Sequence, residues 1–327
     1  MLRLRASVGL QLCLAFASAA AIAGAPACDP CHGGWSTRPY ELPAALDEAT
    51  LRDAISVFSA DGVTSWIVGD HGVLARLDGD DAPTNLPRPI STDLRGIAVA
   101  DGQLVVVGLG GALVVGDLEG ISWTPIDLGT TADLFHVTIL RTRSGTVLVA
   151  VGDEVMYRRD APTGAWRPVP APEGGWGRLR GTQVDIDGSV FAIGLGGVLW
   201  SAPDLAGPWT RVELGITADL TTLGPSGTDA PLIGGSDGTL LGRDSEGWRP
   251  LASPFTGDVA DISSRYILTA PGEIYSYELH PLTLTKVSAP GLGLYVLSEA
   301  VSDGVIALGK PGRQVHVKEA CAGSGGL

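Results

Sequence analysis

The sequence of 327 residues carries 36 acidic and 22 basic side chains, which gives a formal net charge of −14. A chain this acidic repels nucleic acids and anionic lipid surfaces, so neither is an expected partner. The 46 glycines and 22 prolines argue against a helical bundle, and 45% hydrophobic residues suffice for a large core.

Residues 1–27 predict a secretory signal peptide. Arg3 and Arg5 form a short basic region, Val8 to Ile22 is a mostly apolar run, and small residues follow up to Ala27. The run is short and rich in small residues for a membrane-spanning helix. We therefore expect an exported protein, periplasmic or extracellular, that begins with a cysteine-containing segment, residues 28–34.

Cys28, Cys31 and His32 have the C-x-x-C-H spacing at which haem is attached in c-type cytochromes. Only a few residues separate this motif from the first expected strand, so no chain is left to wrap the macrocycle. Met156, the one methionine outside the signal peptide, lies in a strand pattern and suits axial ligation poorly. A c-type haem protein is an alternative interpretation, and we expect no cofactor.

A pattern of about 40 residues repeats along the chain. Each copy begins at an apolar residue, continues through a valine-rich strand that ends in glycine, and then has a glycine turn and a third strand; in most copies a tryptophan-containing strand follows. The copies begin at Leu51, Leu94, Leu134, Leu179, Leu220, Val259 and Leu294. Seven copies with four short strand patterns each predict an all-β fold over residues 35–320, a seven-bladed β-propeller of four-stranded blades.

Paired glycines and single tryptophans recur at fixed places in the copies. The glycines are expected to form the turn between the second and third strands by adopting positive φ: Gly69 and Gly72, Gly108 and Gly111, Gly194 and Gly197, and Gly234 and Gly238. The tryptophans are expected to open the outer strand and cover the blade edge: Trp123, Trp166, Trp209 and Trp248.

The last copy lacks a tryptophan strand, and the segment Trp35 to Tyr40 resembles such a strand without a blade. We expect this segment to pair with Gln314 to Lys318 and close the ring, which leaves no free strand edge between the first and last blades. Residues 321–327 then form a C-terminal tail.

Ring closure would bring Cys321 close to Cys28 and Cys31. Export to an oxidising compartment permits a disulfide from Cys321 to either of them. One cysteine is then left over, and lipidation of Cys28 would use it, although the usual leucine three positions earlier is missing. A local bond between Cys28 and Cys31 is a further alternative, and the pairing stays open.

The pieces "VGDHGVLARLDG" and "DLEGISWTPI" resemble YVTN/BNR-like propellers, a group that includes the photosystem II stability and assembly factor type and the Asp-box repeats of sialidases. Against the Asp-box pattern S-x-D-x-G-x-T-W, Asp204 to Trp209 keeps the Asp and Trp spacing without the Thr. Gly120, Ser122 and Trp123 keep the end of the box, with Leu118 in the Asp position. The resemblance implies the fold and a protein-binding or assembly scaffold.

The residue after each leading apolar position would lie at the central funnel, where propellers usually bind their ligands. These residues are Arg52, Arg95, Phe135, Arg180, Thr221, Ala260 and Tyr295. Three arginines and two aromatic residues on one ring predict a site for a carboxylate, a sulfate or an acidic peptide. In the alternative interpretation, these arginines pair with Asp53, Asp93 and Asp133 in a surface network.

A sialidase-like glycoside hydrolase would use the three arginines as a carboxylate clamp and Tyr295 as the nucleophile. Those enzymes resemble six-bladed rings with longer loops, and no Ser-His-Asp arrangement stands out here. The turns at Asp78 to Asp81 and Asp185 to Gly188 are ordinary, so no metal site is expected. We expect a monomeric binding module without catalysis, whose partner is a protein or a small acidic ligand.

Overall fold

The computed structural model describes most of residues 35–318, and the described part forms one compact unit, Trp35–Lys318. The predicted signal peptide, His32, Cys28, Cys31 and Cys321 lie outside the described residues. Among the described residues, no helix is of a length and apolarity that would cross a bilayer. The described ranges are 35–39, 51–59, 62–79, 81, 83–142, 145–160, 164–185, 187–224, 231–244, 246–263, 265–270, 272–279, 282–287, 294–300, 304–309 and 313–318.

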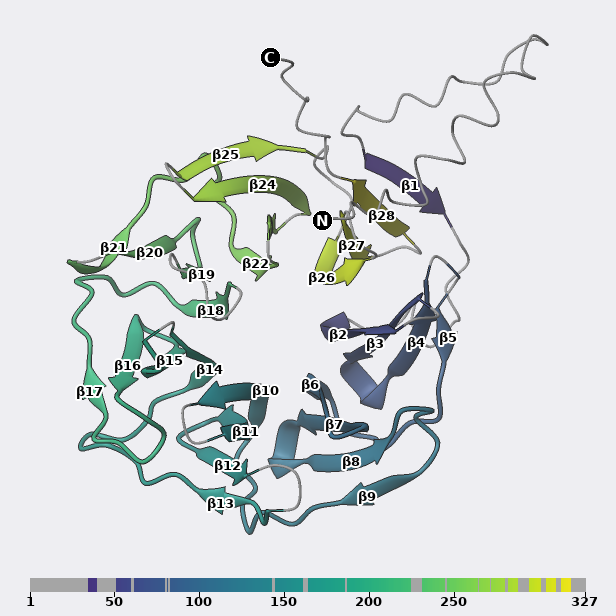
Figure 1. Ribbon diagram of the computed structural model, residues 1–327, viewed down its shortest axis with the longest axis horizontal. Helices are drawn as coiled ribbons and strands as arrows, with labels where there is room; N and C mark the ends of the chain where they lie inside the picture. Colours follow the sequence, from purple (N-terminus) through teal and green to yellow (C-terminus); the bar gives the residue numbers. More distant parts are fainter. Residues whose placement is uncertain are drawn as a thin grey trace, which may run out of the picture. The chain divides into compact units, whose positions relative to one another are not determined.

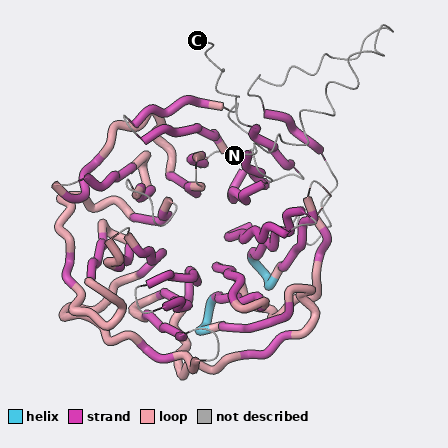
Figure 2. The backbone as a smooth tube through the Cα atoms, in the orientation of Figure 1, coloured by secondary structure: helices cyan, strands magenta, loops and turns pink. Residues whose placement is uncertain are grey.

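This unit is built from strands, as Figures 1 and 2 show, with two short 3-10 turns, η1 (Asp70–Gly72) and η2 (Leu109–Gly111). The first three sheets are each formed by four consecutive strands. Their strands are β2 (Leu51–Ser59), β3 (Gly62–Gly69), β4 (Leu74–Asp78) and β5 (Thr84–Asn85); β6 (Leu94–Ala100), β7 (Gln103–Gly108), β8 (Leu113–Asp117) and β9 (Trp123–Pro125); and β10 (Leu134–Thr142), β11 (Gly145–Gly152), β12 (Met156–Asp160) and β13 (Arg167–Pro168).

The next three sheets follow the same order. Their strands are β14 (Leu179–Val184), β15 (Val190–Gly194), β16 (Val198–Ala202) and β17 (Thr210–Arg211); β18 (Leu220–Leu223), β19 (Leu232–Gly235), β20 (Leu240–Asp244) and β21 (Gly247–Pro250); and β22 (Val259–Ile262), β23 (Tyr266–Thr269), β24 (Glu273–Leu279) and β25 (Leu282–Lys286). The remaining sheet has the order β1-β28-β27-β26, with β1 (Trp35–Pro39), β26 (Leu294–Ala300), β27 (Gly304–Gly309) and β28 (Arg313–Lys318).

The chain is an all-β propeller of four-stranded blades, but the prediction of a seven-bladed propeller is corrected, because six blades rather than seven are each formed by four consecutive strands. Six blades, β2 to β25, are complete in consecutive strands, whereas the copy from Leu294 supplies only three. The sheet of that copy is composite, because β1 from the other end of the described chain adds its fourth strand. Trp35 lies opposite Val317 and Pro39 opposite Arg313 in this pairing.

The innermost strands form the centre of the unit (Figure 1). Each one contacts the next in the order β2, β6, β10, β14, β18, β22 and β26, and β26 contacts β2. The second strands behind them are buried on both faces, as their runs of β-branched residues predict. Leu104 and Val107 of β7, for example, are fully buried. This packing fixes the innermost strands as a rigid frame for the side chains at the centre.

Glycines form the turns between second and third strands, but positive φ explains only half of them. The second glycine of each predicted pair has positive φ, for example +76° at Gly111. The first glycine is extended, with φ −166° at Gly108, and is required by close approach, because a Cβ there would lie 2.3 Å from the Asp93 carbonyl oxygen. In the blade from Leu220 the equivalent first glycine is Gly235 rather than Gly234, since its Cβ would lie 2.1 Å from the Asp219 carbonyl oxygen.

The turn before Trp123, which the sequence analysis compared with an Asp-box, is organised by Asp117. Asp117, rather than the residue at position 118, accepts hydrogen bonds from the backbone N–H groups of Ile121 (2.9 Å) and Ser122 (3.1 Å). The bond from Ile121 is the main cause of the lowered pKa of Asp117. Trp123 then donates its indole N–H to the Gly120 carbonyl at 3.2 Å, so these contacts stabilise a structural turn.

Candidate functional site

A β-bulge at the start of every innermost strand presents the predicted ring residues. In each of these described strands the pairing register with the second strand skips the residue after the leading apolar position. Bulges bend a strand and re-aim a side chain, and they are common beside binding sites. The skipped residues are Arg52, Arg95, Phe135, Arg180, Thr221, Ala260 and Tyr295.

Six of these seven residues line one central cavity of about 700 Å³. The walls of this cavity come from β2, β6, β10, β14, β18 and β22, so the predicted ring is assembled from six blades. Tyr295 belongs to β26, whose side chains lie outside the description. The geometry brings together Arg52, Arg95, Phe135 and Arg180, whereas ligand binding by them stays a prediction.

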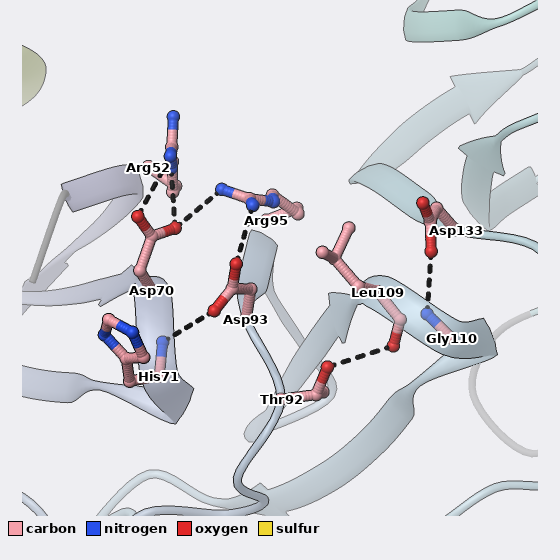
Figure 3. Close-up of polar contacts among 9 residues, drawn as sticks. All are labelled: Arg52, Asp70, His71, Thr92, Asp93, Arg95, Leu109, Gly110 and Asp133. Atoms are coloured by element: carbon pink, nitrogen blue, oxygen red, sulfur yellow. Dashed lines mark hydrogen bonds and ion pairs between the residues drawn. The ribbon is translucent and has the colours of Figure 1, made fainter.

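Arg52 and Arg95 are held by carboxylates (Figure 3). Arg52 donates Nε and Nη2 to the two oxygens of Asp70 at 2.9 and 3.0 Å. Arg95 donates to Asp70 at 2.7 Å and to Asp93 at 2.9 Å. The expected network is therefore present for these two arginines, but its centre is Asp70 on η1 rather than Asp53.

Aspartates that precede innermost strands have a second role, which the sequence analysis missed. Each accepts a hydrogen bond from the backbone N–H at the tip of a turn in the preceding blade; for Asp93 and Asp133 the donors are His71 and Gly110, both at 2.8 Å (Figure 3). Asp219 and Asp258 repeat the contact. The signal in the sequence was an Asp directly before the leading apolar residue in four of the copies. These aspartates connect neighbouring blades by hydrogen bonds at the rim of the cavity.

Arg180 differs from the other two ring arginines. Among the described residues it has no hydrogen bond or ion pair, and its guanidinium lies 3.8 Å from the centre of the Phe135 ring. Burial, with the nearby charges of Arg178 and Arg95, lowers the pKa of Arg180 from its ordinary value, although the charges of Asp219 and Asp153 oppose the shift. Arg178 is more exposed and pairs with Asp153 at 3.1 Å. Arg180 thus presents a guanidinium at the cavity that is backed by an aromatic ring and has no hydrogen bond to a described residue.

Two carboxyl groups line the same cavity one position further along their strands. Asp53 of β2 accepts hydrogen bonds from the backbone N–H groups of Ala54 and Ile97, both at 2.9 Å. Asp261 of β22 accepts one from Ile262 at 2.8 Å. Burial raises the pKa of Asp53 to about 7, and the charge of Asp261 adds to the shift.

His136 of β10 also lines the cavity and is uncharged above mildly acidic pH. Burial lowers its pKa to about 4, and its Nδ1 atom has no hydrogen-bond partner. Among the described residues, no group of three or more His, Cys, Asp or Glu side chains is placed to hold a metal ion. At the turn from Asp185 to Gly188, Asp185 instead forms an ion pair with Arg243 of the next blade.

No family model matches the sequence, and no curated protein matches it. Solved propeller structures do match it. A streptogramin B lyase is 12% identical, with a TM-score of 0.70 over 87% of this chain and 97% of that one. YCF48 bound to a D1 peptide is 16% identical, with a TM-score of 0.63 over 88% and 98%. YCF48 from Cyanidioschyzon merolae is 15% identical, also with a TM-score of 0.63, over 87% and 98%. The predicted resemblance to propellers of this type is confirmed as a likeness in fold.

Proposed function

We propose that the protein is an exported, non-catalytic binding module, and that the central cavity holds an anionic group of a protein partner or small ligand. The observation that carries this proposal is Arg180, a half-buried guanidinium without a carboxylate partner among the described residues. An arginine presents several donors in a fixed plane, which suits a carboxylate or sulfate oxygen pair. Burial of the arginine strengthens such a contact, because fewer waters compete for it.

The surroundings of Arg180 support the same proposal. Arg52 and Arg95 already share Asp70 and Asp93, so they hold the rim and add little net positive charge. Phe135 supports the guanidinium plane and orients it. The complex of YCF48 with a D1 peptide shows that a propeller with this fold can bind a peptide. A protein segment that ends in, or contains, carboxylates is therefore a suitable occupant.

Arg180→Ala is expected to weaken binding of a labelled octaglutamate peptide by about tenfold or more, since a hydrogen bond to a charged group contributes about 1.5–3 kcal/mol. Fluorescence anisotropy at low salt measures the change. Arg211→Ala is the matched control, because it removes the same positive charge from the protein. Arg211 lies on the outer strand β17 and does not line the cavity. Equal affinities for the two variants would contradict the proposed site.

Export and the cysteines give a separate prediction. Strands β1 and β28 pair with Trp35 opposite Val317. In the sequence, Cys31 stands four residues before Trp35, and Cys321 stands four residues after Val317. We expect the exported protein to have an intact mass two hydrogens below that of the cleaved chain, from one disulfide between Cys321 and Cys31 or Cys28. Non-reducing peptide mapping assigns the pair. A mass increased by an acyl group would identify Cys28 as lipidated, and one increased by haem would contradict this interpretation.

A further inference from the structure

We propose that Asp53 makes anion binding in the central cavity depend on pH, so that binding is tighter in mildly acidic solution than in mildly alkaline solution. This inference rests on the proposed anion site and adds its regulation. Asp53 of β2 and Arg180 of β14 line the same cavity. Two other innermost strands, β6 and β10, lie between β2 and β14. A ligand anion at Arg180 therefore shares its cavity with whatever charge Asp53 carries.

The position of Asp53 determines the charge that it can hold. It follows the bulged Arg52, and both of its oxygens accept backbone N–H groups, one from its own strand and one from β6 of the next blade. These bonds fix the carboxyl group at the cavity wall and prevent it from turning toward a cation. Asp261 lines the same wall region from β22 and adds a like charge. Losing one proton from this pair makes the cavity more negative.

The other charged and titratable groups around Asp53 come from its own strand and from the elements around it. Its own strand contributes Arg52, η1 contributes Asp70 and His71, β6 contributes Arg95, and β22 contributes Asp261. His136 stays neutral, because burial has lowered its pKa to about 4. Strand β26, which contacts β2, carries Glu299 in its sequence. His71 is exposed on η1 and requires a control of its own.

Protonation of Asp53 falls in the physiological range because the wall of the cavity buries it, and the resulting pKa is about 7. Arg180 remains a cation throughout this range. A unit charge on the wall of the same cavity, partly screened by water and salt, changes the affinity for an anion by about threefold to tenfold. We therefore expect affinity for an anionic ligand to decrease by this factor from pH 6 to pH 8.5.

The test is binding of labelled octaglutamate to the full-length exported protein from pH 6 to pH 8.5, a range in which the glutamates stay ionised. The wild type is expected to lose affinity as the pH rises, and Asp53→Asn to bind with nearly constant affinity. Asp261→Asn removes the neighbouring like charge, so its midpoint is expected at lower pH than that of the wild type. His71→Gln is the control, and it should retain the wild-type profile.

The outcomes separate this inference from the site on which it rests. Binding of the wild type with a flat pH profile would overturn the role of Asp53 and leave the anion site intact. A pH dependence that persists in Asp53→Asn, or disappears in His71→Gln, would also overturn it. Absence of octaglutamate binding at every pH would overturn the anion site and this inference together. Should Asp53→Asn fail to fold by circular dichroism, the shifted midpoint of Asp261→Asn decides the question.

Discussion

Asp53→Asn is expected to gain stability relative to the wild type as the pH rises from about 4 to about 7, by up to about 4 kcal/mol in the free energy of unfolding. The folded protein holds a proton on Asp53 up to a pKa of about 7, because burial disfavours the carboxylate. The unfolded chain releases the same proton near pH 4. Between these values the folded state binds more protons, so the wild type loses stability as the pH increases.

Urea unfolding of both proteins between pH 4.5 and 8 measures this difference. Comparing the variant with the wild type cancels the contribution of His136, whose pKa of about 4 gives a dependence of the opposite sign between pH 4 and 6.5. The value is an upper limit, since the Asp53 carboxyl group lines a cavity that water can enter. Asp127→Asn, in an exposed turn, is the control for the loss of a surface carboxylate. A constant difference for Asp53→Asn would show that burial does not raise the pKa of Asp53.

Gly111→Ala is expected to destabilise the protein by about 3 kcal/mol or more, which lowers the thermal midpoint by several degrees. Gly111 has φ +76°, where a Cβ is strained, and that Cβ would lie 2.1 Å from the Thr130 carbonyl oxygen. Both groups belong to the backbone, one in the turn η2 and one in the segment that leads to the next blade, so neither can move without displacing the other.

Gly129→Ala separates the two causes. Gly129 has a similar φ of +69°, but a Cβ there would meet no atom within 4 Å. We therefore expect this variant to lose only about 1 kcal/mol, from backbone strain alone. Thermal unfolding followed by circular dichroism compares the two. Equal thermal midpoints for the two variants would show that the contact between the Gly111 Cβ and the Thr130 carbonyl oxygen does not destabilise the protein.

The periodic features of the fold could be predicted from the sequence, because each repeats and each has a local cause. Leu51 and its equivalents begin the innermost strands in the structure, as the leading apolar residue of a copy indicates. The pairing of residues 35–39 with 313–317 followed from one missing tryptophan strand. The reason for the first glycine of each turn needed coordinates. The close approach of Gly108 to the Asp93 carbonyl, for example, cannot be recognised in a single sequence, which shows only that the residue is glycine.

The candidate site was only partly predictable for a similar reason. Repetition indicated which positions face the centre, and Arg52, Arg95, Phe135 and Arg180 do line one cavity. Repetition does not say which aspartate each arginine meets, because the partners lie on different blades. The lack of an ion pair between Arg180 and a described carboxylate, and the raised pKa of Asp53, depend on packing between strands that are far apart in the chain.

The bulge at each innermost strand has a consequence for how such a protein can evolve. The ring residue is left out of the pairing register with the second strand, so a change of side chain there does not alter that register. Thr221 and Ala260 occupy the same kind of position as Arg180, with quite different chemistry. The chemistry of the cavity wall can therefore change by single substitutions at these positions, one blade at a time, while the residues that determine the fold of each repeat stay the same.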